Sequence, residues 1–332
     1  MKRIFSGIQP TGNLHLGNYL GAVKNWVKLQ STYECIYCIV DMHAITTFQD
    51  PKKLTQNIRD AAAILIASGI NINSSILFNQ SRVPMHAELA WIFNCIAKIG
   101  WLNRMTQFKD KAGKNREKAS AGLYIYPNLM AADILSYKAT HVPVGDDQKQ
   151  HLELTRDIAI SFNDSYGIKY FPVVEPLIIG EATRVMSLRD GSKKMSKSDN
   201  SDFTRINITD SKDVIASKIK KAKTDSLPVP ESITALSGRL EAKNLLGIFA
   251  ALKEVSLEKI IKDYGGGTFS VLKEDLAECI ISELVPVSSE IKNLQNNREY
   301  LDKILKDGAT KAEEISKPII KEVKEIVGFL VA

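Results

Sequence analysis

Several features that would mark a specialised class of protein are missing from this sequence. It contains no run of about 18 consecutive apolar residues, so we expect no membrane-spanning segment. The first strand-like run follows Met1 almost at once, which leaves no room for a signal or transit peptide. No internal repeat or low-complexity tract is present. We therefore expect a globular protein of the cytoplasm.

Cysteine is scarce, with 4 residues in 332. Cys35 and Cys38 have the spacing of a metal-binding pair, but they lie in an apolar segment typical of a buried strand. Residues three apart on a strand point to opposite faces, so these thiols could not bind one metal ion there without a turn. No second pair or neighbouring histidine completes a zinc site, and we interpret the cysteines as structural.

The remaining composition is that of a globular chain about two domains long. Of its 332 residues, 44% are hydrophobic and 25% are charged, which is ordinary for a folded protein. The 44 Lys and Arg residues exceed the 38 Asp and Glu residues, giving a formal net charge of +6. This mild excess permits a polyanionic partner without requiring one.

Short apolar segments alternate with helical patterns in the first part of the chain, where strands are expected at residues 3–8, 34–40, 75–78, 141–144 and 177–179. The alternation predicts an α/β fold with a Rossmann-like, doubly wound parallel sheet, which binds ligands beyond the carboxyl ends of its strands. Later residues show only helical patterns, at about 210–221, 240–255, 257–264, 269–284, 288–305 and 309–327. We predict a sheet domain over residues 1–190 and an all-helical domain over 191–332.

The segment after the first strand combines turn residues with polar side chains. Pro10 and Gly12 should end the strand, and a helix should begin near His15. A helix N-terminus after a strand presents backbone N–H groups and a positive dipole end, which suit phosphate. Gly17 would let a flat group approach, and Asn18 adds a donor. An ordinary strand–helix unit with incidental polar residues is the alternative interpretation.

A helix expected from Pro127 carries a carboxylate among apolar side chains. Tyr126, Met130, Asp133 and Tyr137 fall on one helical face. Burying a carboxylate is costly unless a donor reaches it. Either a lysine or arginine pairs with Asp133 or a ligand N–H does, and the residues alone leave both open.

Three loops carry charged residues that could bind a nucleotide. The basic loop at 108–118 is either a solvated loop or a clamp over an anion. The loop at 145–148 suits ribose hydroxyls, or simply caps the next helix. The loop at 190–199 has three serines, three lysines and no apolar support, which predicts a mobile loop able to close over a triphosphate.

Two of these segments carry a family resemblance. Residues 10–18, Pro-Thr-Gly-Asn-Leu-His-Leu-Gly-Asn, resemble the HIGH signature of class I aminoacyl-tRNA synthetases, and residues 194–198, Lys-Met-Ser-Lys-Ser, match their KMSKS signature. Segments 5–10, 39–45, 130–134 and 142–151 extend the resemblance to the bacterial tryptophanyl-tRNA synthetases over nearly the whole chain. Asn18 replaces the second histidine of HIGH, as it does in relatives of this type.

The resemblance implies an enzyme that activates L-tryptophan with ATP and transfers it to the 3′-terminal adenosine of tRNA(Trp). Mg²⁺ would be held mainly by the phosphates, the helical domain would read the anticodon, and the chain would form a homodimer. The implied catalytic residues are His15, Asn18, Lys111, Lys194 and Lys197. The implied ATP-binding residues are Gln9, Pro10, Thr11, Gly17, Asn18, Gly145, Asp146, Asp147, Val185, Lys194, Met195, Ser196, Lys197 and Ser198. Asp133 would accept the indole N–H, in a tryptophan site shared with Phe5, Gly7, His43, Tyr126, Met130, Val144 and Gln148.

Three other functions share parts of this pattern. A tyrosyl-tRNA synthetase has the same fold but normally carries a tyrosine on the first strand, where this chain has Phe5. A small nucleotidylyltransferase with a HIGH-like motif usually lacks the helical half. A non-catalytic RNA-binding paralogue would be expected to lose a signature lysine, whereas Lys194 and Lys197 are both present.

Overall fold

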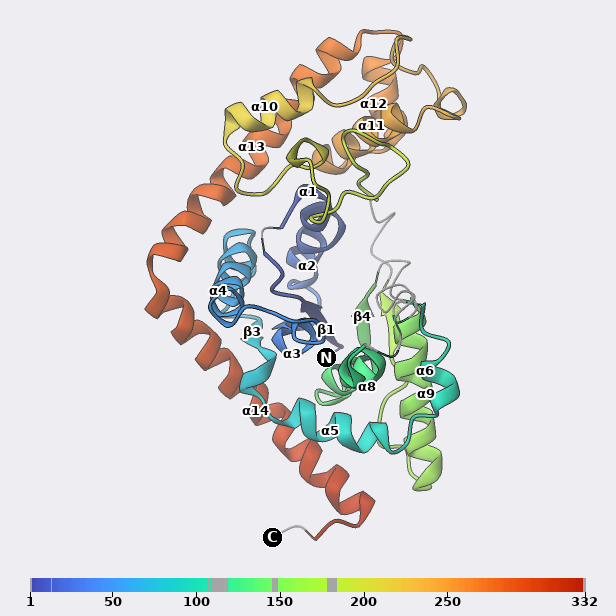
Figure 1. Ribbon diagram of the computed structural model, residues 1–332, viewed down its shortest axis with the longest axis vertical. Helices are drawn as coiled ribbons and strands as arrows, with labels where there is room; N and C mark the ends of the chain where they lie inside the picture. The colour runs from blue at the N-terminus through green and yellow to red at the C-terminus, as the bar shows by residue number, and fades with distance from the viewer. Residues whose placement is uncertain are drawn as a thin grey trace.

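The structure is a computed structural model that describes residues 2–12, 14–106, 108, 117, 119–144, 149–177 and 184–330. Figure 1 shows a sheet with helices on both faces, a helical cap at one end and two long helices along one side. The strands are parallel in the order β3-β2-β1-β4-β5. They span Arg3–Ile8 (β1), Glu34–Ile39 (β2), Ile76–Asn79 (β3), His141–Pro143 (β4) and Glu175–Leu177 (β5). The predicted Rossmann-like sheet is confirmed.

The strands alternate their side chains between two hydrophobic cores. On β2, Cys35 and Tyr37 pack in the first core, and Ile36 and Cys38 pack in the second. Cys35 and Cys38 are therefore buried free thiols on opposite faces of the sheet, as their spacing predicted. The helices that cover the first face are α2 (Lys24–Leu29) and α4 (Pro51–Ala67), and those that cover the second are α5 (Met85–Asn94), α8 (Ala121–Leu135) and α9 (Lys149–Ser165).

The helix after β1 changes its hydrogen-bond pattern along its length. It begins as α1 (Leu16–Asn18), continues as the π-helical segment η1 (Tyr19–Val23) and ends as α2. The start predicted near His15 is confirmed, whereas nothing in the sequence indicated the π-helical turn. Such turns are uncommon and frequently lie at functional sites.

Helix α8 begins earlier than the sequence analysis predicted. It starts at Ala121 rather than Pro127, because the Ser120 hydroxyl accepts the Leu123 N–H at 3.2 Å and caps the first turn. Pro127 lies inside the helix and removes one backbone donor. The rest of the helix is intact, with Asp133 near its end.

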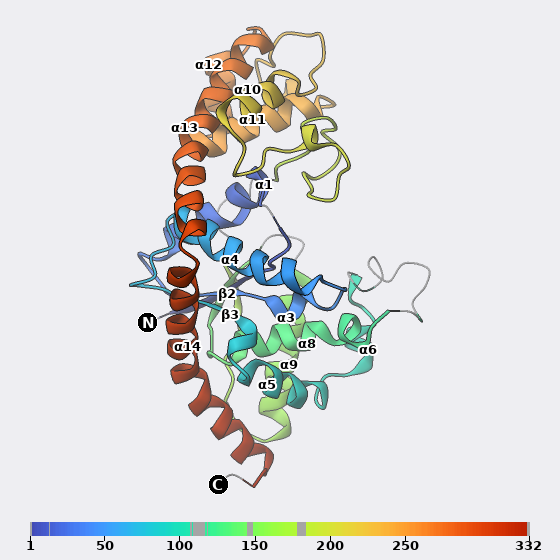
Figure 2. The same ribbon diagram turned by 60° about the vertical axis from the view of Figure 1, so that its left-hand side comes forward.

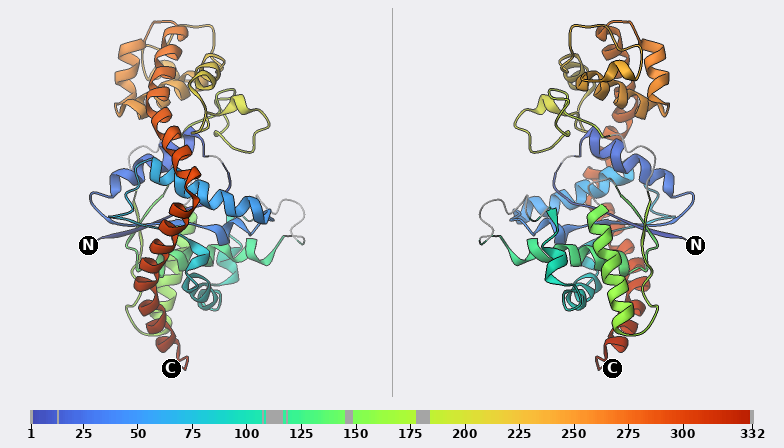
Figure 3. Two further views of the ribbon diagram at one scale, coloured as in Figure 1. Left: turned by 90° about the vertical axis from the view of Figure 1, so that its left-hand side faces the viewer. Right: turned by 90° about the vertical axis from the view of Figure 1, so that its right-hand side faces the viewer.

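The helical half contains α10 (Lys212–Lys220), α11 (Leu240–Lys253), α12 (Leu257–Tyr264), α13 (Phe269–Asn296) and α14 (Arg298–Val327). The sequence analysis predicted three helices over the last two, and this was wrong. Pro286 lies within α13 and Gly308 within α14, so neither ends a helix. The break comes at Asn297, whose side chain accepts the Tyr300 N–H at 3.2 Å. Figure 3 shows the two helices running the length of the molecule.

Helix α14 packs against the sheet and not against the helical cap, which consists of α10, α11, α12 and the start of α13 (Figure 2). Gly308 lies so close to the edge strand β3 that a Cβ at this position would be 1.9 Å from the Leu77 carbonyl oxygen. Leu305 packs in the first core and Ala309 in the second, so α14 passes the sheet edge at this glycine. It thereby covers strand β3, which would otherwise expose unpaired backbone groups. The domain division at residue 190 stays a prediction.

None of the described helices is long and apolar enough to cross a membrane.

Candidate active site

The strand order reverses between β1 and β4, because β1 pairs with β2 on one side and with β4 on the other. Ligands of doubly wound sheets bind at this point, beyond the carboxyl ends of the strands. Gly7 and Gln9, at the end of β1, are exposed there. The segment after residue 184 lies next to α1 in Figure 1. The first helix of the α/β region and the segment that follows this region therefore meet at this edge.

Backbone pairing holds His15 against the helical half. The Leu16 N–H donates to the Ile206 carbonyl at 2.8 Å, and the Ile208 N–H donates to the Leu14 carbonyl at 3.0 Å. His15 lies between these bonds and is only 4% exposed. The HIGH-like segment is therefore fixed by contacts distant in the sequence.

The buried imidazole of His15 lies among cations. Burial first, and then the positive charges of Lys197, Arg205 and Lys194, lower the pKa of His15 to about 4. The ring is therefore neutral near pH 7. The positive potential that keeps it neutral also favours the approach of a polyanion.

Three other residues of the predicted nucleotide site lie beside His15. The Asn18 Oδ1 accepts the backbone N–H of His15 at 3.2 Å and caps the first turn. A Cβ at Gly17 would be 3.0 Å from the His15 ring and 3.4 Å from Cβ of Val185. Only a glycine therefore fits without displacing this ring, and Gly17 lies next to Val185.

The KMSKS segment is anchored by an apolar side chain. Met195 is 2% exposed in the first core, and its N–H donates to the Val185 carbonyl at 3.1 Å. The Ser187 N–H likewise donates to the Lys193 carbonyl at 2.8 Å. The expectation that this loop has no apolar support was wrong, because the Met195 side chain packs in the first core.

Lys197 connects the two signature segments. Its Nζ donates to Thr11 Oγ1 and to the Gly12 carbonyl oxygen, both at 3.2 Å. Burial lowers the pKa of Lys197 to about 8, so the ammonium is mostly charged at pH 7 and incompletely solvated. Two neutral oxygens are weak partners for such a cation, and a phosphate would be a stronger one.

Asp133 is 1% exposed and accepts from three donors among the described residues. Oδ1 accepts from Gln80 Nε2 at 2.5 Å and from His86 Nδ1 at 2.6 Å, and Oδ2 accepts from His43 Nε2 at 2.7 Å. Burial tends to raise the pKa of Asp133, but the His43 and His86 rings lower it overall. Its partners are thus histidines and a glutamine, and the lysine or arginine considered from the sequence was wrong.

Aromatic side chains surround this carboxylate. The Phe5 ring stacks on Tyr137 with centroids 5.6 Å apart, and the His43 ring lies edge-on to Tyr126 at 6.0 Å. Met130 is half-buried one turn before Asp133. Of the other residues assigned to the tryptophan site, Gly7 is exposed and Val144 is half-buried at the end of β4. The assigned residues that lie outside the described part of the chain are Lys111, Gly145, Asp146, Asp147 and Gln148.

Three residues of this region were not predicted as site residues from the sequence. Gln80 directly follows the last residue of β3, and the tendency of ligands to bind beyond the carboxyl ends of the strands could have indicated it. His86 lies in the first turn of α5, and only the fold brings it to Asp133. Arg205 approaches His15 through the long-range pairing of its own segment, which no local signal indicates.

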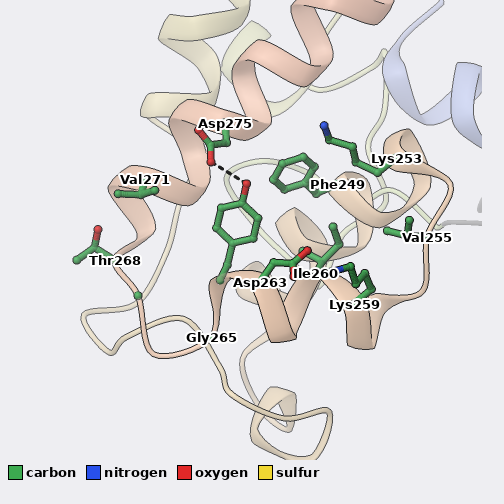
Figure 4. A pocket seen from close by; sticks show the side chains of 12 residues that line it. Phe249, Lys253, Val255, Lys259, Ile260, Asp263, Gly265, Thr268, Val271 and Asp275 are labelled. Atoms are coloured by element: carbon green, nitrogen blue, oxygen red, sulfur yellow. Dashed lines mark hydrogen bonds and ion pairs between the residues drawn. The ribbon is translucent and has the colours of Figure 1, made fainter.

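A separate cavity of about 710 Å³ lies in the helical cap between α11, α12 and α13. Figure 4 shows side chains that line it, among them Phe249 and Asp275. Tyr264 also lines it, and its hydroxyl donates to Asp275 at 2.7 Å. Lys259 at its rim pairs with Asp263 at 2.8 Å. No residue of either signature segment lines it, so the candidate active site lies at the sheet edge instead.

A parallel sheet of this order, with a HIGH-like segment after β1 and a KMSKS segment packed over it, defines the catalytic domain of a class I aminoacyl-tRNA synthetase. The family model described as tRNA synthetases class I (W and Y) matches residues 1–284. The chain belongs to this family, whose two letters stand for tryptophan and tyrosine.

Relatives resemble the chain over almost all of its length. Tryptophan–tRNA ligases of Rhizobium meliloti and Brucella melitensis are 56% and 54% identical to it over 346 aligned residues, which cover 98% of both chains in each case. The tryptophanyl-tRNA synthetase of Mycoplasma pneumoniae has a TM-score of 0.84 at 31% identity, covering 99% of this chain and 98% of that one. The Campylobacter jejuni enzyme, solved with ADP and tryptophan, has a TM-score of 0.81 at 34% identity, covering 98% and 100%.

Proposed function

We propose that this chain is a tryptophan–tRNA ligase that activates L-tryptophan with ATP and then transfers it to the 3′-terminal adenosine of tRNA(Trp). The observation that carries the proposal is the contact between the two signature segments through Lys197, beside a neutral His15 in a positive potential. The relatives support tryptophan as the amino acid, since the ligases named above share more than half of their residues with this chain.

In the first step, a tryptophan carboxylate oxygen attacks the α-phosphorus of ATP. The bond from the α-phosphorus to the bridging oxygen breaks, pyrophosphate leaves with the electron pair, and tryptophanyl-adenylate remains. In the second step, a ribose hydroxyl of the terminal adenosine attacks the acyl carbon and AMP leaves. No protein nucleophile is needed, so the chain contributes positioning and charge stabilisation.

The proposed nucleotide site is the surface around the HIGH-like and KMSKS segments. Gly17 and Val185 would contact adenine, and the side chains of His15 and Asn18 would face phosphate. Lys194 and Lys197 would neutralise charge that moves onto the leaving pyrophosphate. The remaining proposed nucleotide contacts are Gln9, Pro10, Thr11, Met195, Ser196 and Ser198, with Gly145, Asp146, Asp147 and Lys111 from outside the described part of the chain. ATP would enter with Mg²⁺ on its phosphates, which is the usual state of this ion.

The proposed amino-acid site lies at Asp133. Among the described residues His43 is the single donor to its Oδ2, so this oxygen keeps a lone pair for the indole N–H of tryptophan. Phenylalanine would leave this buried acceptor without its fourth bond, which costs binding energy. Selection against amino acids without a suitable donor follows from this requirement.

We further propose a homodimer that acts in the cytoplasm, where tRNA and ATP are available. Trp91 on α5 is 66% exposed, and Ile99 at the start of α6 (Ile99–Leu102) is 70% exposed. Large exposed apolar side chains on two consecutive helices favour burial in a subunit interface. The helical cap is proposed to read the anticodon.

ATP–pyrophosphate exchange with each standard amino acid tests this proposal. We expect exchange with tryptophan and none of comparable rate with the others, followed by charging of tRNA(Trp). Preferential exchange with tyrosine would make the chain a tyrosyl-tRNA synthetase. Absence of exchange with any amino acid, in a chain that still binds RNA, would favour the non-catalytic alternative.

A further inference from the structure

We propose that Gln80 and His86 are positioning residues that saturate Oδ1 of Asp133, so that Oδ2 is held at one place as the atom that recognises tryptophan. The inference rests on the proposed function and concerns residues that contact the carboxylate and not the substrate. Both side chains are completely buried. They approach from different elements, Gln80 from the turn after β3 and His86 from α5.

A count of lone pairs separates the two carboxylate oxygens. Each carboxylate oxygen offers about two acceptor sites. Oδ1 accepts from Gln80 at 2.5 Å and from His86 at 2.6 Å, so both of its sites are used. Oδ2 accepts from His43 at 2.7 Å and keeps one site. With the donors of the described residues counted, Asp133 can thus accept a single further donor, through Oδ2.

The orientation of Gln80 is fixed from its other end. Its Oε1 accepts the Met42 N–H at 3.1 Å, and this places the amide NH₂ toward Asp133. Met42 and His43 belong to the same short helix, α3 (Asp41–Ala44). One turn of chain therefore positions the donors on both oxygens of the carboxylate.

The tautomer of His86 follows from its two neighbours. Asp133 as a carboxylate only accepts, so Nδ1 of His86 carries the proton that it shares with Oδ1 at 2.6 Å. Nε2 lies 2.7 Å from the Tyr137 hydroxyl. In the tautomer with the proton on Nδ1, Nε2 accepts a hydrogen bond from the Tyr137 hydroxyl, which keeps its proton because burial raises the pKa of Tyr137. Tyr137, His86 and Asp133 form a directed chain of hydrogen bonds that resists rotation of the carboxylate.

A fixed acceptor distinguishes donors by position as well as by presence. Tryptophan has its N–H on the side of a double ring, tyrosine has its O–H at the tip of a single ring, and phenylalanine has neither. An Oδ2 held in one place can match one of the first two. If the carboxylate could turn, it would follow either donor, so loss of the holding bonds should relax discrimination against tyrosine.

The test compares His86→Leu with His86→Asn, because an asparagine amide can replace the Nδ1–H donor and leucine cannot. Gln80→Met removes the second donor at similar volume. Exchange kinetics would use tryptophan, tyrosine and 3-(benzothiophen-3-yl)alanine, a tryptophan analogue with sulfur in place of the N–H. In His86→Leu and Gln80→Met we expect the preference for tryptophan over the sulfur analogue, and over tyrosine, to fall about tenfold or more. His86→Asn should retain most of both preferences, and the KM for ATP should be unchanged in every variant.

The outcomes separate this inference from the proposed function. If the unmodified chain does not exchange with tryptophan, the proposed function fails. If it does, and both donor-free variants keep the unmodified preferences, the positioning role is refuted while the function stands. If His86→Leu does not fold, Gln80→Met decides. If melting curves show that both variants are unfolded, the contacts serve stability and a specific positioning role is likewise refuted.

Discussion

Removing the Lys197 ammonium should slow adenylate formation far more than it weakens binding of either substrate. In the free chain this ammonium contacts two neutral oxygens at 3.2 Å, and burial lowers its pKa to about 8. A cation that is already desolvated needs little reorganisation when negative charge develops on the leaving phosphates. We therefore expect Lys197→Ala to reduce the rate of ATP–pyrophosphate exchange by roughly 100-fold or more, the scale of one lost electrostatic stabiliser. The tryptophan dissociation constant should barely change.

The lowered pKa of Lys197 also predicts proton uptake when ATP binds. Above pH 8 the free chain has largely lost this proton, and phosphates beside Nζ favour its return because they favour the charged form. If ATP restores an ordinary lysine pKa, binding at pH 8.5 should take up roughly 0.7 proton per site. For the same reason kcat/KM for ATP should decline as the pH rises through about 8, the pKa of Lys197 in the free chain.

Calorimetry in buffers of different ionisation enthalpy measures the uptake, and exchange kinetics measure the rate. Lys193→Ala is a matched control, because this lysine lies in the same loop with a side chain 75% exposed and pairs with Asp190 at 3.2 Å. An exposed pair of this kind contributes little, so the control should change exchange by less than about twofold. The reasoning is refuted if Lys197→Ala behaves like the control, or if proton uptake persists without the Lys197 amine.

Three further changes test other parts of the structure. Gly308→Ala would bring a Cβ to 1.9 Å from the Leu77 carbonyl oxygen and should lower the free energy of unfolding by roughly 3 kcal/mol or more. Gly247→Ala is the control, because a Cβ there has nothing within 4 Å, and it should raise the free energy of unfolding by about 0.5–1 kcal/mol. Urea unfolding of the two variants measures the difference. Asp133→Ala should cost tryptophan activation roughly 2–3 kcal/mol and shrink discrimination against phenylalanine, and an unchanged ratio of the two specificity constants would contradict the indole assignment. Lys262→Glu, on the exposed side of α12, should weaken tRNA charging but not exchange, and equal loss in both assays would contradict an anticodon role for the cap.

The sheet could be predicted from the sequence because its signals are local. Each strand is a short apolar run, and neighbouring residues alternate between two cores, as Cys35 and Ile36 do. The two ends of helix α4 also have local signals. Asp50 caps its start by accepting the Lys52 N–H at 2.9 Å, and Gly69 adopts a φ of 108° just after its end. These features depend on a few adjacent residues, so no knowledge of the fold is needed.

The errors came where distant packing overrides a local preference. Gly308 suggests the end of a helix, but α14 continues through it because the β3 backbone leaves no room for a side chain. Pro286 costs one hydrogen bond in α13, and buried neighbours such as Leu284 and Ile291 hold the helix on either side. Propensity alone assigned breaks at both positions, whereas the tertiary contacts keep the helices continuous.

The candidate site was predictable in part for the same reason. The two signatures selected His15 and Lys197, and a carboxylate among apolar residues on one helical face selected Asp133. They did not show that Met195 anchors the KMSKS segment in the core, since a single apolar residue in a polar loop gives no periodic signal. Nor did they show how Asp133 is satisfied, because Gln80 is 53 positions away from it and meets it only in the fold.

The two cores explain why the proposed site has two separable halves. Leu16, Val185 and Met195, which belong to the segments of the proposed nucleotide site, pack in the first core. The residues on either side of Asp133, with Phe5 of β1, pack in the second. The two sets meet at β1, since Ile4 belongs to the first core and Phe5 to the second. Because β1 bonds to β2 on one side and β4 on the other, its position fixes how far a carboxylate bound near Asp133 lies from a phosphate bound near His15. Precise alignment of the two substrates therefore depends on the central strand as much as on the residues that contact them.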